Sequence, residues 1–334
     1  MLSPDLGALV RKTCWVYVLI QCCLVTPAVA AGIQLLDSDP NLAGAIWYPC
    51  AAEPQSVPIG SLAVPPVADP LPGVKDCPVS GTNLPLVIVS HGRGGWFAGH
   101  HDVAEALADA GFVVAAINHP GDTGSDSSKR DTLSLFESRP QDMVRLLDFM
   151  LNDWKDKASI DRTRIGFFGF SFGGYTGLVL AGAKPDFGRL ASFCTDKTGA
   201  CEQLHNGETP PNPPHDARIR AAVIADAPGG VFTPDNLAAI KIPLQFWRSE
   251  LGGPGADASG TARVARSLPG KPDVHVLPAG HYGFLPPCLP QLAANLPRFC
   301  TDPPGFDRTA FHRDFDASIV RFFREHLVGD GESR

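Results

Sequence analysis

A single serine lies between two glycines in residues 169–173, which read GFSFG. The spacing is G-x-S-x-G, and it follows the strand-like run RIGFF and precedes a helical pattern, so it predicts a sharp strand-to-helix turn. Larger residues two places before or after the serine would collide in such a turn, which explains the glycines. Ser171 is therefore a candidate nucleophile for acyl transfer. The alternative is a serine that only caps the following helix.

Acyl transfer also requires hydrogen-bond donors for the oxyanion that develops on the substrate. The segment SHGRGG, residues 90–95, follows the apolar run at residues 86–89 and predicts a loop at the end of a buried strand. We expect the backbone N–H of Arg93 to be one donor and that of Phe172, next to the serine, to be the other. An ordinary glycine turn at residues 90–95 is the alternative.

The general base should be a histidine beyond the last strand, because acyl-transfer sites built on a G-x-S-x-G turn have the order serine, acid, histidine along the chain. His281 fits this place, since it follows the strand-like DVHVL and the short loop PAG. The other histidines considered precede the serine, lie in an irregular segment, or lie by the last helix: His100, His101, His119, His205, His215, His312 and His326.

Two strand ends could supply the acid that orients the base. Asp226 follows the apolar run AAVIA, and Glu250 follows LQFWRS. We favour Asp226, whose shorter side chain is stiffer, and keep Glu250 as the alternative acid; Asp257 is a weaker candidate. The alternative for Asp226 is a turn residue whose side chain hydrogen-bonds to its own backbone.

The elements that must position these residues alternate between strands and helices. Buried strand patterns precede the serine, the Asp226 candidate and the His281 candidate, and amphipathic helices lie between them, which predicts a mostly parallel central sheet covered on both faces. The rhythm breaks at residues 184–217 and 286–306, which we interpret as insertions in a single domain spanning residues 31–334. Residues 51–82, rich in Pro, Ala and Val, predict an irregular excursion.

The N-terminal residues have the pattern of an export signal. Arg11 and Lys12 precede the apolar run TCWVYVLIQCCLV, and AVA at residues 28–30 fits a cleavage site. We predict a signal peptide over residues 1–30 and a periplasmic or secreted protein with no stable membrane anchor after cleavage. The alternatives are an uncleaved anchor, for which the run is short, and a lipoprotein signal ending at Cys22.

Cleavage would leave six of the nine cysteines. The simplest pairing in an exported protein joins sequential neighbours, although the sequence alone leaves other pairings and reduced cysteines open. We therefore expect three local disulfides: Cys50–Cys77, Cys194–Cys201 and Cys288–Cys300. The chain has no C-x-x-C or H-x-x-x-H spacing typical of zinc sites. The net charge of −7 and the absence of Lys/Arg runs disfavour binding to nucleic acid.

Several stretches together resemble α/β-hydrolases of the platelet-activating-factor acetylhydrolase type and bacterial proteins predicted to be dienelactone hydrolases. They are IWYP, LPLVIVSHGRGG, AINHPGDT, RPQDMVRLLDFM, RIGFFGFSFGG and AGHYGF, spread over about residues 45–285. The resemblance implies the α/β-hydrolase fold and a serine esterase without metal or cofactor. It matches Ser171 to the nucleophile, His281 to the base, and Arg93 and Phe172 to the oxyanion donors. In acetylhydrolases of this type the acid follows the strand after the nucleophile helix, which matches Asp226.

The predicted function is hydrolysis of a small-molecule carboxylic ester, short-acyl or derived from a phospholipid. We expect an apolar pocket built partly from the aromatic residues near the site, others of which pack the core: Trp96, Phe97, Phe170, Phe172, Tyr282 and Phe284. Alternatives are a peptidase, thioesterase or polyester hydrolase with the same residues, or a silent hydrolase-fold binding protein. A true dienelactone hydrolase usually has a cysteine nucleophile, so Ser171 disfavours that activity. The sequence leaves the oligomeric state open.

Overall fold

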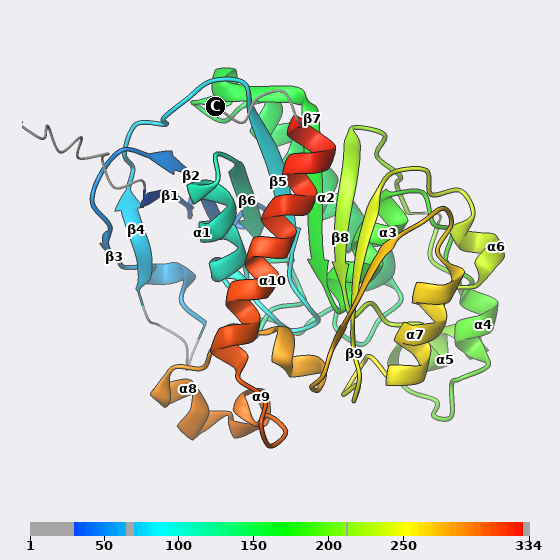
Figure 1. Cartoon of the computed structure of the whole chain (residues 1–334). Coiled ribbons are helices and arrows are strands. Elements are labelled where there is room, and N and C mark those ends of the chain that lie inside the picture. The colour runs from blue at the N-terminus through cyan, green and yellow to red at the C-terminus, as the bar shows by residue number, and fades with distance from the viewer. Residues whose placement is uncertain (1–29, 65–69, 212, 330–334) are drawn as a thin grey trace, which may run out of the picture.

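The structure, a computed structural model, describes residues 30–64, 70–211 and 213–329, so the predicted signal peptide lies outside it except for its last residue. Ten strands form one sheet in the order β10-β9-β8-β7-β5-β6-β2-β1-β4-β3 (Figure 1). In that order their bounds are Asp273–Leu277, Leu244–Ser249, Ile219–Ala225, Ile160–Phe170, Leu84–Ser90, Val113–Ile117, Gly44–Cys50, Ala30–Leu36, Leu71–Lys75 and Gln55–Val57.

The strands from β10 to β6 are parallel to their neighbours, and β2 pairs antiparallel with both β6 and β1. The central strands are apolar on both faces: all the residues of β6 and the last six of both β5 and β7 are buried. Continuous apolar runs of this kind belong to parallel strands covered on both sides.

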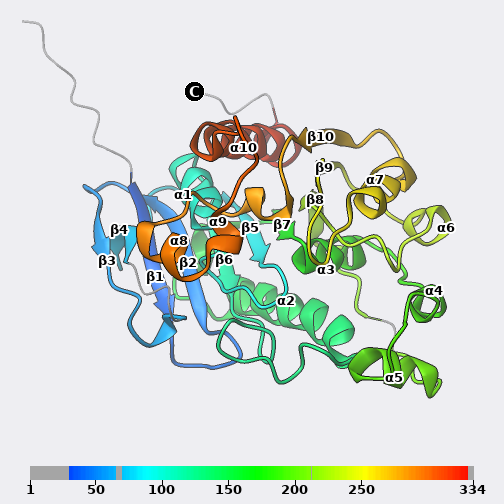
Figure 2. The ribbon, with the colours of Figure 1, turned by 90° about the horizontal axis from the view of Figure 1, so that it is seen from below.

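Helices cover both faces of the sheet. In Figures 1 and 2, α1 (His101–Asp109) and α10 (Arg308–Phe323) lie side by side on one face, and α2 (Ser134–Asn152) and α3 (Phe172–Leu180) lie on the other. Each face has its own apolar core, one with Leu107 and Phe315 and the other with Met143 and Leu178. The predicted mostly parallel sheet between two helical layers is confirmed.

Helix α2 begins at Ser134, before the stretch RPQDMVRLLDFM, and contains Pro140. A proline has no N–H to donate to the carbonyl four residues earlier, so the Phe136 carbonyl loses its partner within the helix. The Tyr175 hydroxyl on α3 donates to that carbonyl at 3.0 Å. This bond joins α2 to α3 next to the turn that contains Ser171.

Both segments interpreted as insertions contain short helices rather than plain loops. Residues 184–217 hold α4 (Phe187–Ala191) and α5 (Gly199–His205), and residues 286–306 hold α8 (Pro290–Asn295) and α9 (Pro297–Cys300). The three predicted cysteine pairs all form disulfides, and the two short ones tie these segments, so the predicted pairing is confirmed. Helices this short show too few turns for a periodic sequence signal.

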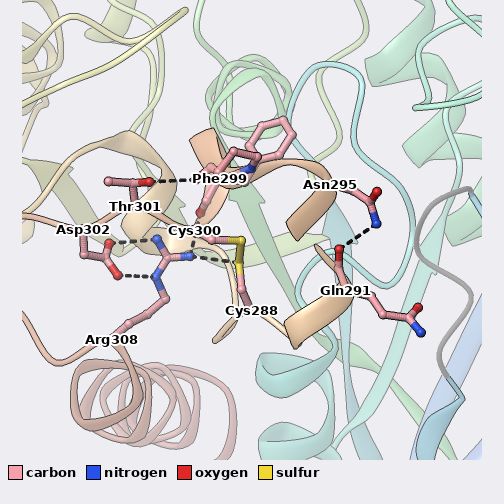
Figure 3. Close-up of a disulfide and its surroundings, with 9 residues drawn as sticks. Cys288, Gln291, Asn295, Phe299, Cys300, Thr301, Asp302 and Arg308 are labelled. Atoms are coloured by element: carbon pink, nitrogen blue, oxygen red, sulfur yellow. Dashed lines mark hydrogen bonds and ion pairs between the residues drawn. A yellow bond between two sulfur atoms is a disulfide. The ribbon is translucent and has the colours of Figure 1, made fainter. Parts of the chain in front are cut away.

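The segment tied by Cys288–Cys300 is also held by a buried arginine (Figure 3). Arg308 donates to both oxygens of Asp302, at 2.9 and 2.8 Å, and to the Phe299 carbonyl at 2.8 Å. Because Arg308 is the first residue of α10, it fixes this segment against the helix that follows.

The predicted irregular excursion at residues 51–82 was partly wrong, because its described residues contain β3 and β4, which pair antiparallel. Three-residue β3 is too short for its alternation to stand out in the sequence. The remaining elements are α6 (Pro234–Leu237), α7 (Ala258–Ser267), η1 (Gly60–Leu62), η2 (Lys157–Ser159), η3 (His281–Phe284) and η4 (Arg324–Val328). Within the described ranges, every helix is too short or too polar to span a bilayer.

Candidate active site

Ser171 lies at the turn between β7 and α3 with φ 55° and ψ −119°. A β-carbon at Gly169 would lie 2.2 Å from the Gly173 carbonyl oxygen, and one at Gly173 would lie 1.9 Å from the Ser90 carbonyl oxygen. Both contacts are impossible, so each glycine of the G-x-S-x-G spacing is required by backbone that passes next to it. The turn leaves Ser171 7% exposed at the N-terminus of α3.

Asp226 follows β8 directly and also has a positive φ, of 51°. Its Oδ1 accepts a hydrogen bond from the Ser249 backbone N–H at 2.8 Å, and its Oδ2 accepts one from the Ser249 hydroxyl at 2.6 Å. Since β8 and β9 are adjacent and parallel, the last residue of β9 lies beside the residue after β8. These two donors fix the orientation of a fully buried carboxylate.

His281, the first residue of η3, lies between Ser171 and Asp226. Its Nε2 is 2.9 Å from the Ser171 Oγ, and its Nδ1 is 2.6 Å from the Asp226 Oδ2. The ring stacks on Phe170 with 4.6 Å between centroids. The backbone N–H of His281 donates to the Gly252 carbonyl at 2.8 Å. Hydroxyl, imidazole and carboxylate thus form one continuous hydrogen-bonded chain, in an order suited to removing the serine proton.

The segment after β5 lies against the serine turn, because a β-carbon at Gly92 would lie 3.2 Å from the Ser171 Cβ. Within the described part of the chain, the backbone N–H groups of Arg93 and Phe172 donate no hydrogen bond. Two unpaired backbone donors beside a candidate nucleophile suit the binding of an oxyanion. The Arg93 guanidinium itself lies over the Phe172 ring, 5.5 Å from its centroid.

Two buried ionic side chains hold this loop on either side of Arg93. Arg139 on α2 donates to the His91 carbonyl and, at 3.1 Å, to Asp122, whose other oxygen accepts from the Gly94 N–H at 2.9 Å. Burial lowers the pKa of Arg139 to about 10, which still leaves it charged at neutral pH. Neither Arg139 nor Asp122 was predicted as a site residue; for Arg139 the available signal was a charged residue close to the apolar positions of α2.

A second array of serine, histidine and aspartate lies beneath the same loop. Ser90 Oγ is 2.9 Å from the Nε2 of His119, and His119 Nδ1 is 2.9 Å from the Oδ2 of Asp142. Burial lowers the pKa of His119 far below its usual value and raises the pKa of Asp142 to about 6. Ser90 is completely buried, unlike Ser171, so this array supports the loop and is closed to any substrate.

The alternative acids lie elsewhere. Glu250 is exposed, and only its backbone N–H is fixed, by the Leu277 carbonyl at 2.8 Å. Asp257 caps α7 by accepting from the Gly260 N–H at 2.7 Å. Among the other histidines, His100 and His119 are buried, and His312 is bound to Asp102. None of these side chains bonds to Ser171, Asp226 or His281. Ser249, which does bond to Asp226, was not predicted, because a serine at the end of a strand has no local sequence signature for this role.

Most of the six aromatic residues considered for the pocket are buried in the core, as the sequence analysis allowed for some of them. Trp96 and Tyr282 are half-buried, whereas the other four are buried: Phe97, Phe170, Phe172 and Phe284. Tyr282 packs edge-on against Phe299 of α9, with 4.6 Å between ring centroids. The disulfide-tied segment therefore contacts the residue next to His281 and forms part of the surroundings of the site.

One group of described side chains has the composition of a cation site. Asp102, His312 and Asp316 bring one ligand atom each within 4.8 Å of one another. Both ring nitrogens of His312 are already engaged, by Asp102 and by the Gly283 carbonyl. We therefore assign no metal to this group.

Comparisons with known proteins agree with this architecture. A family described as the alpha/beta hydrolase fold matches residues 85–246, which contain the Gly-rich loop, Ser171 and Asp226. The chain has the α/β-hydrolase fold. A solved structure of a ferulic acid esterase from Streptomyces cinnamoneus is similar, with a TM-score of 0.61, 19% identity and 93% of each chain covered. No curated protein sequence matches this chain.

Proposed function

We propose that the protein is a serine hydrolase that cleaves carboxylic esters through an acyl-enzyme, with Ser171 as nucleophile, His281 as general base and Asp226 as the acid. The observation that carries the proposal is the bridging position of His281, 2.9 Å from the Ser171 Oγ and 2.6 Å from the Asp226 Oδ2. The α/β-hydrolase fold and the esterase named for a structural neighbour add support.

The reaction has two half-reactions. His281 Nε2 takes the hydroxyl proton as the Ser171 Oγ attacks the ester carbonyl, and Asp226 balances the imidazolium that forms. The N–H groups of Arg93 and Phe172 bind the oxyanion of the tetrahedral intermediate. His281 returns the proton to the leaving alcohol. Water then attacks the acyl-enzyme by the same steps and releases the acid and free Ser171.

The substrate class follows from the surroundings of Ser171. Phe170 and Phe172 flank it in the chain, and the half-buried rings of Trp96 and Tyr282 belong to segments beside the site. We propose an ester whose acyl group is uncharged and either short or aromatic, including short-acyl phospholipid derivatives of the type that acetylhydrolases cleave. No feature of the described residues favours a peptide or thioester over an ester.

A hydrolysis panel tests the proposal. The purified full chain is assayed with p-nitrophenyl esters of increasing acyl length, methyl ferulate, a phospholipid with a short sn-2 acyl group, an acyl thioester and a peptide. We expect turnover of esters, with a loss on the order of 10⁶-fold in kcat for Ser171→Ala. Ser192→Ala, a change of an exposed serine directly after α4, is the matched control and should keep full activity. Turnover by Ser171→Ala equal to wild type would reject the mechanism.

A further inference from the structure

A part-buried contact between a histidine and an aspartate joins the two helices on one face of the sheet. Asp102 is in the first turn of α1, and His312 is in the second turn of α10. The Nδ1 of His312 is 2.6 Å from the Asp102 Oδ2, and the two side chains are 4% and 16% exposed. The helices lie next to each other in both views (Figures 1 and 2).

The other ring nitrogen of His312 reaches the segment that contains His281. Nε2 of His312 is 3.0 Å from the carbonyl oxygen of Gly283, two residues after His281 in η3. A carbonyl only accepts hydrogen bonds, and so does an ionised carboxylate, so both ring nitrogens must donate. Burial alone would raise the pKa of Asp102, but the hydrogen bond and charge of His312 lower it, which favours the ionised carboxylate as the acceptor for Nδ1.

Few other polar contacts fix η3. The His281 N–H is bound to Gly252, and Phe284 packs on Phe311 and Phe315 of α10, with 5.9 and 5.6 Å between ring centroids. Among the described side chains, His312 alone hydrogen-bonds to the backbone of η3. Apolar packing resists separation but tolerates sliding, whereas a charge-assisted hydrogen bond fixes direction as well as distance.

We infer that His312, held by Asp102, is a positioning residue that anchors the Gly283 carbonyl and so keeps the His281 ring in line with both Ser171 and Asp226. The inference rests on the proposed function for its catalytic consequence, although the anchoring itself does not. A ring that must meet two partners at 2.9 and 2.6 Å tolerates little movement of its backbone. Misplacement by about 1 Å can cost on the order of 10²-fold in rate.

Four variants separate this role from plain packing. His312→Phe fills the same space beside Phe311 and Phe315 but donates nothing, and Asp102→Leu removes the partner that holds the ring. Asp102→Asn is the conservative rescue, because its amide can donate to Nδ1 of a neutral His312 whose Nε2–H still donates to Gly283. Asp314→Asn is the matched control: it lies two residues after His312 on α10, its side chain is exposed, and no bond among the described residues joins it to η3.

The experiment measures each full-length variant in two ways. Hydrogen exchange followed by mass spectrometry reports on residues 279–285, whose Gly283 and Leu285 amides are bonded to Gly280 and Tyr282. Steady-state hydrolysis of p-nitrophenyl butyrate, corrected by active-site titration, gives kcat and KM. We expect His312→Phe and Asp102→Leu to exchange faster at residues 279–285 and to lose about 10- to 100-fold in kcat with KM nearly unchanged. Asp102→Asn should recover most of both properties, and Asp314→Asn should match wild type.

Unchanged exchange in His312→Phe would overturn the anchor, and so would an unchanged kcat per active site despite faster exchange. If His312→Phe does not fold, Asp102→Leu compared with Asp102→Asn makes the same test. A wild-type protein that hydrolyses no ester, but in which only His312→Phe and Asp102→Leu speed exchange at residues 279–285, would refute the proposed function while supporting the anchor.

Discussion

At the scale of single residues, Ser171 and Asp226 share an unusual feature: both have positive φ values, 55° and 51°. Conformations of this kind cost non-glycine residues on the order of 1–3 kcal/mol each and persist only where the surroundings impose them. Ser171 directly follows β7, and Asp226 directly follows β8. Each is held by a backbone hydrogen bond to the neighbouring strand: the Ser171 N–H donates to the Ala225 carbonyl, and the Asp226 N–H donates to the Trp247 carbonyl. The sheet thus fixes the two residues between which the His281 ring lies.

The choice of acid gives a direct prediction. Asp226→Asn keeps the shape of the side chain but removes its negative charge, so the positive charge of the His281 imidazolium is no longer compensated. An amide NH2 in place of Oδ2 would also favour the wrong tautomer of His281. We expect kcat to fall by about 10⁴-fold. Glu250→Gln is the matched control, since Glu250 is exposed, and should stay within about two-fold of wild type. Steady-state kinetics on p-nitrophenyl butyrate decide it, and the reverse ranking would identify Glu250 as the acid.

The buried histidine beneath the oxyanion loop predicts an acid-sensitive fold. Burial lowers the pKa of His119, so the folded protein keeps it neutral while the unfolded chain binds a proton below about pH 6.5. Stability is therefore lost as the pH falls through that value. When the pH is lowered from 7.5 to 6, the unfolding free energy of His119→Gln should fall by about 1 kcal/mol less than that of wild type. Urea titrations at both pH values measure this, and equal losses would contradict it.

At the scale of elements, the sequence predicted those parts whose signal is local. The G-x-S-x-G turn, the strand before Asp226 and the loop before His281 each have a compact signature, and so the three candidate residues could be named. Arg139 and Asp122 were missed because their role depends on where α2 crosses the loop, which no local pattern encodes. The bond from Tyr175 to the Phe136 carbonyl could not be predicted either, because it joins residues of two helices that are 39 positions apart in the chain.

That helix-to-helix bond can be tested by a double-mutant cycle. Tyr175→Phe leaves the buried Phe136 carbonyl unpaired and should cost about 1–3 kcal/mol of unfolding free energy. Pro140→Ala restores an N–H within α2 that can bond to the same carbonyl, so Tyr175→Phe should cost clearly less in the Pro140→Ala background. Urea denaturation of the four proteins gives the coupling. Strict additivity would show that the freed carbonyl is not what Tyr175 stabilises.

At the scale of the whole molecule, the three disulfides fit the predicted export of the chain, because such bonds persist in oxidising compartments. The predicted signal peptide accounts for the remaining three cysteines, which lie outside the described residues. Pairing of sequential neighbours could be predicted because each loop is short. The placement of the Cys288–Cys300 segment beside Tyr282 could not, since it depends on Phe299 meeting a residue from another part of the chain.

The disulfides should differ in what they stabilise. Cys50–Cys77 joins residues 27 apart and is buried in the core, so in the chain-entropy view Cys50→Ser/Cys77→Ser should cost about 3–4 kcal/mol of unfolding free energy. The Cys288–Cys300 disulfide closes a smaller loop, so Cys288→Ser/Cys300→Ser should cost less stability. It should nevertheless raise KM, because Phe299 then loses its fixed place against Tyr282. Denaturation curves and ester kinetics measure both. A KM unchanged by the second pair of substitutions would contradict the contact's role.

The central claim is that the Ser171 hydroxyl is activated while the equally patterned Ser90 hydroxyl is sealed in the core. The most direct measurement is the position of a fluorophosphonate adduct, found by peptide mass spectrometry after labelling the folded protein. We predict a stoichiometric adduct on Ser171, none on Ser90, and loss of labelling in His281→Ala. Folded protein that stays unlabelled at Ser171, or that is labelled on another serine instead, would contradict the claim.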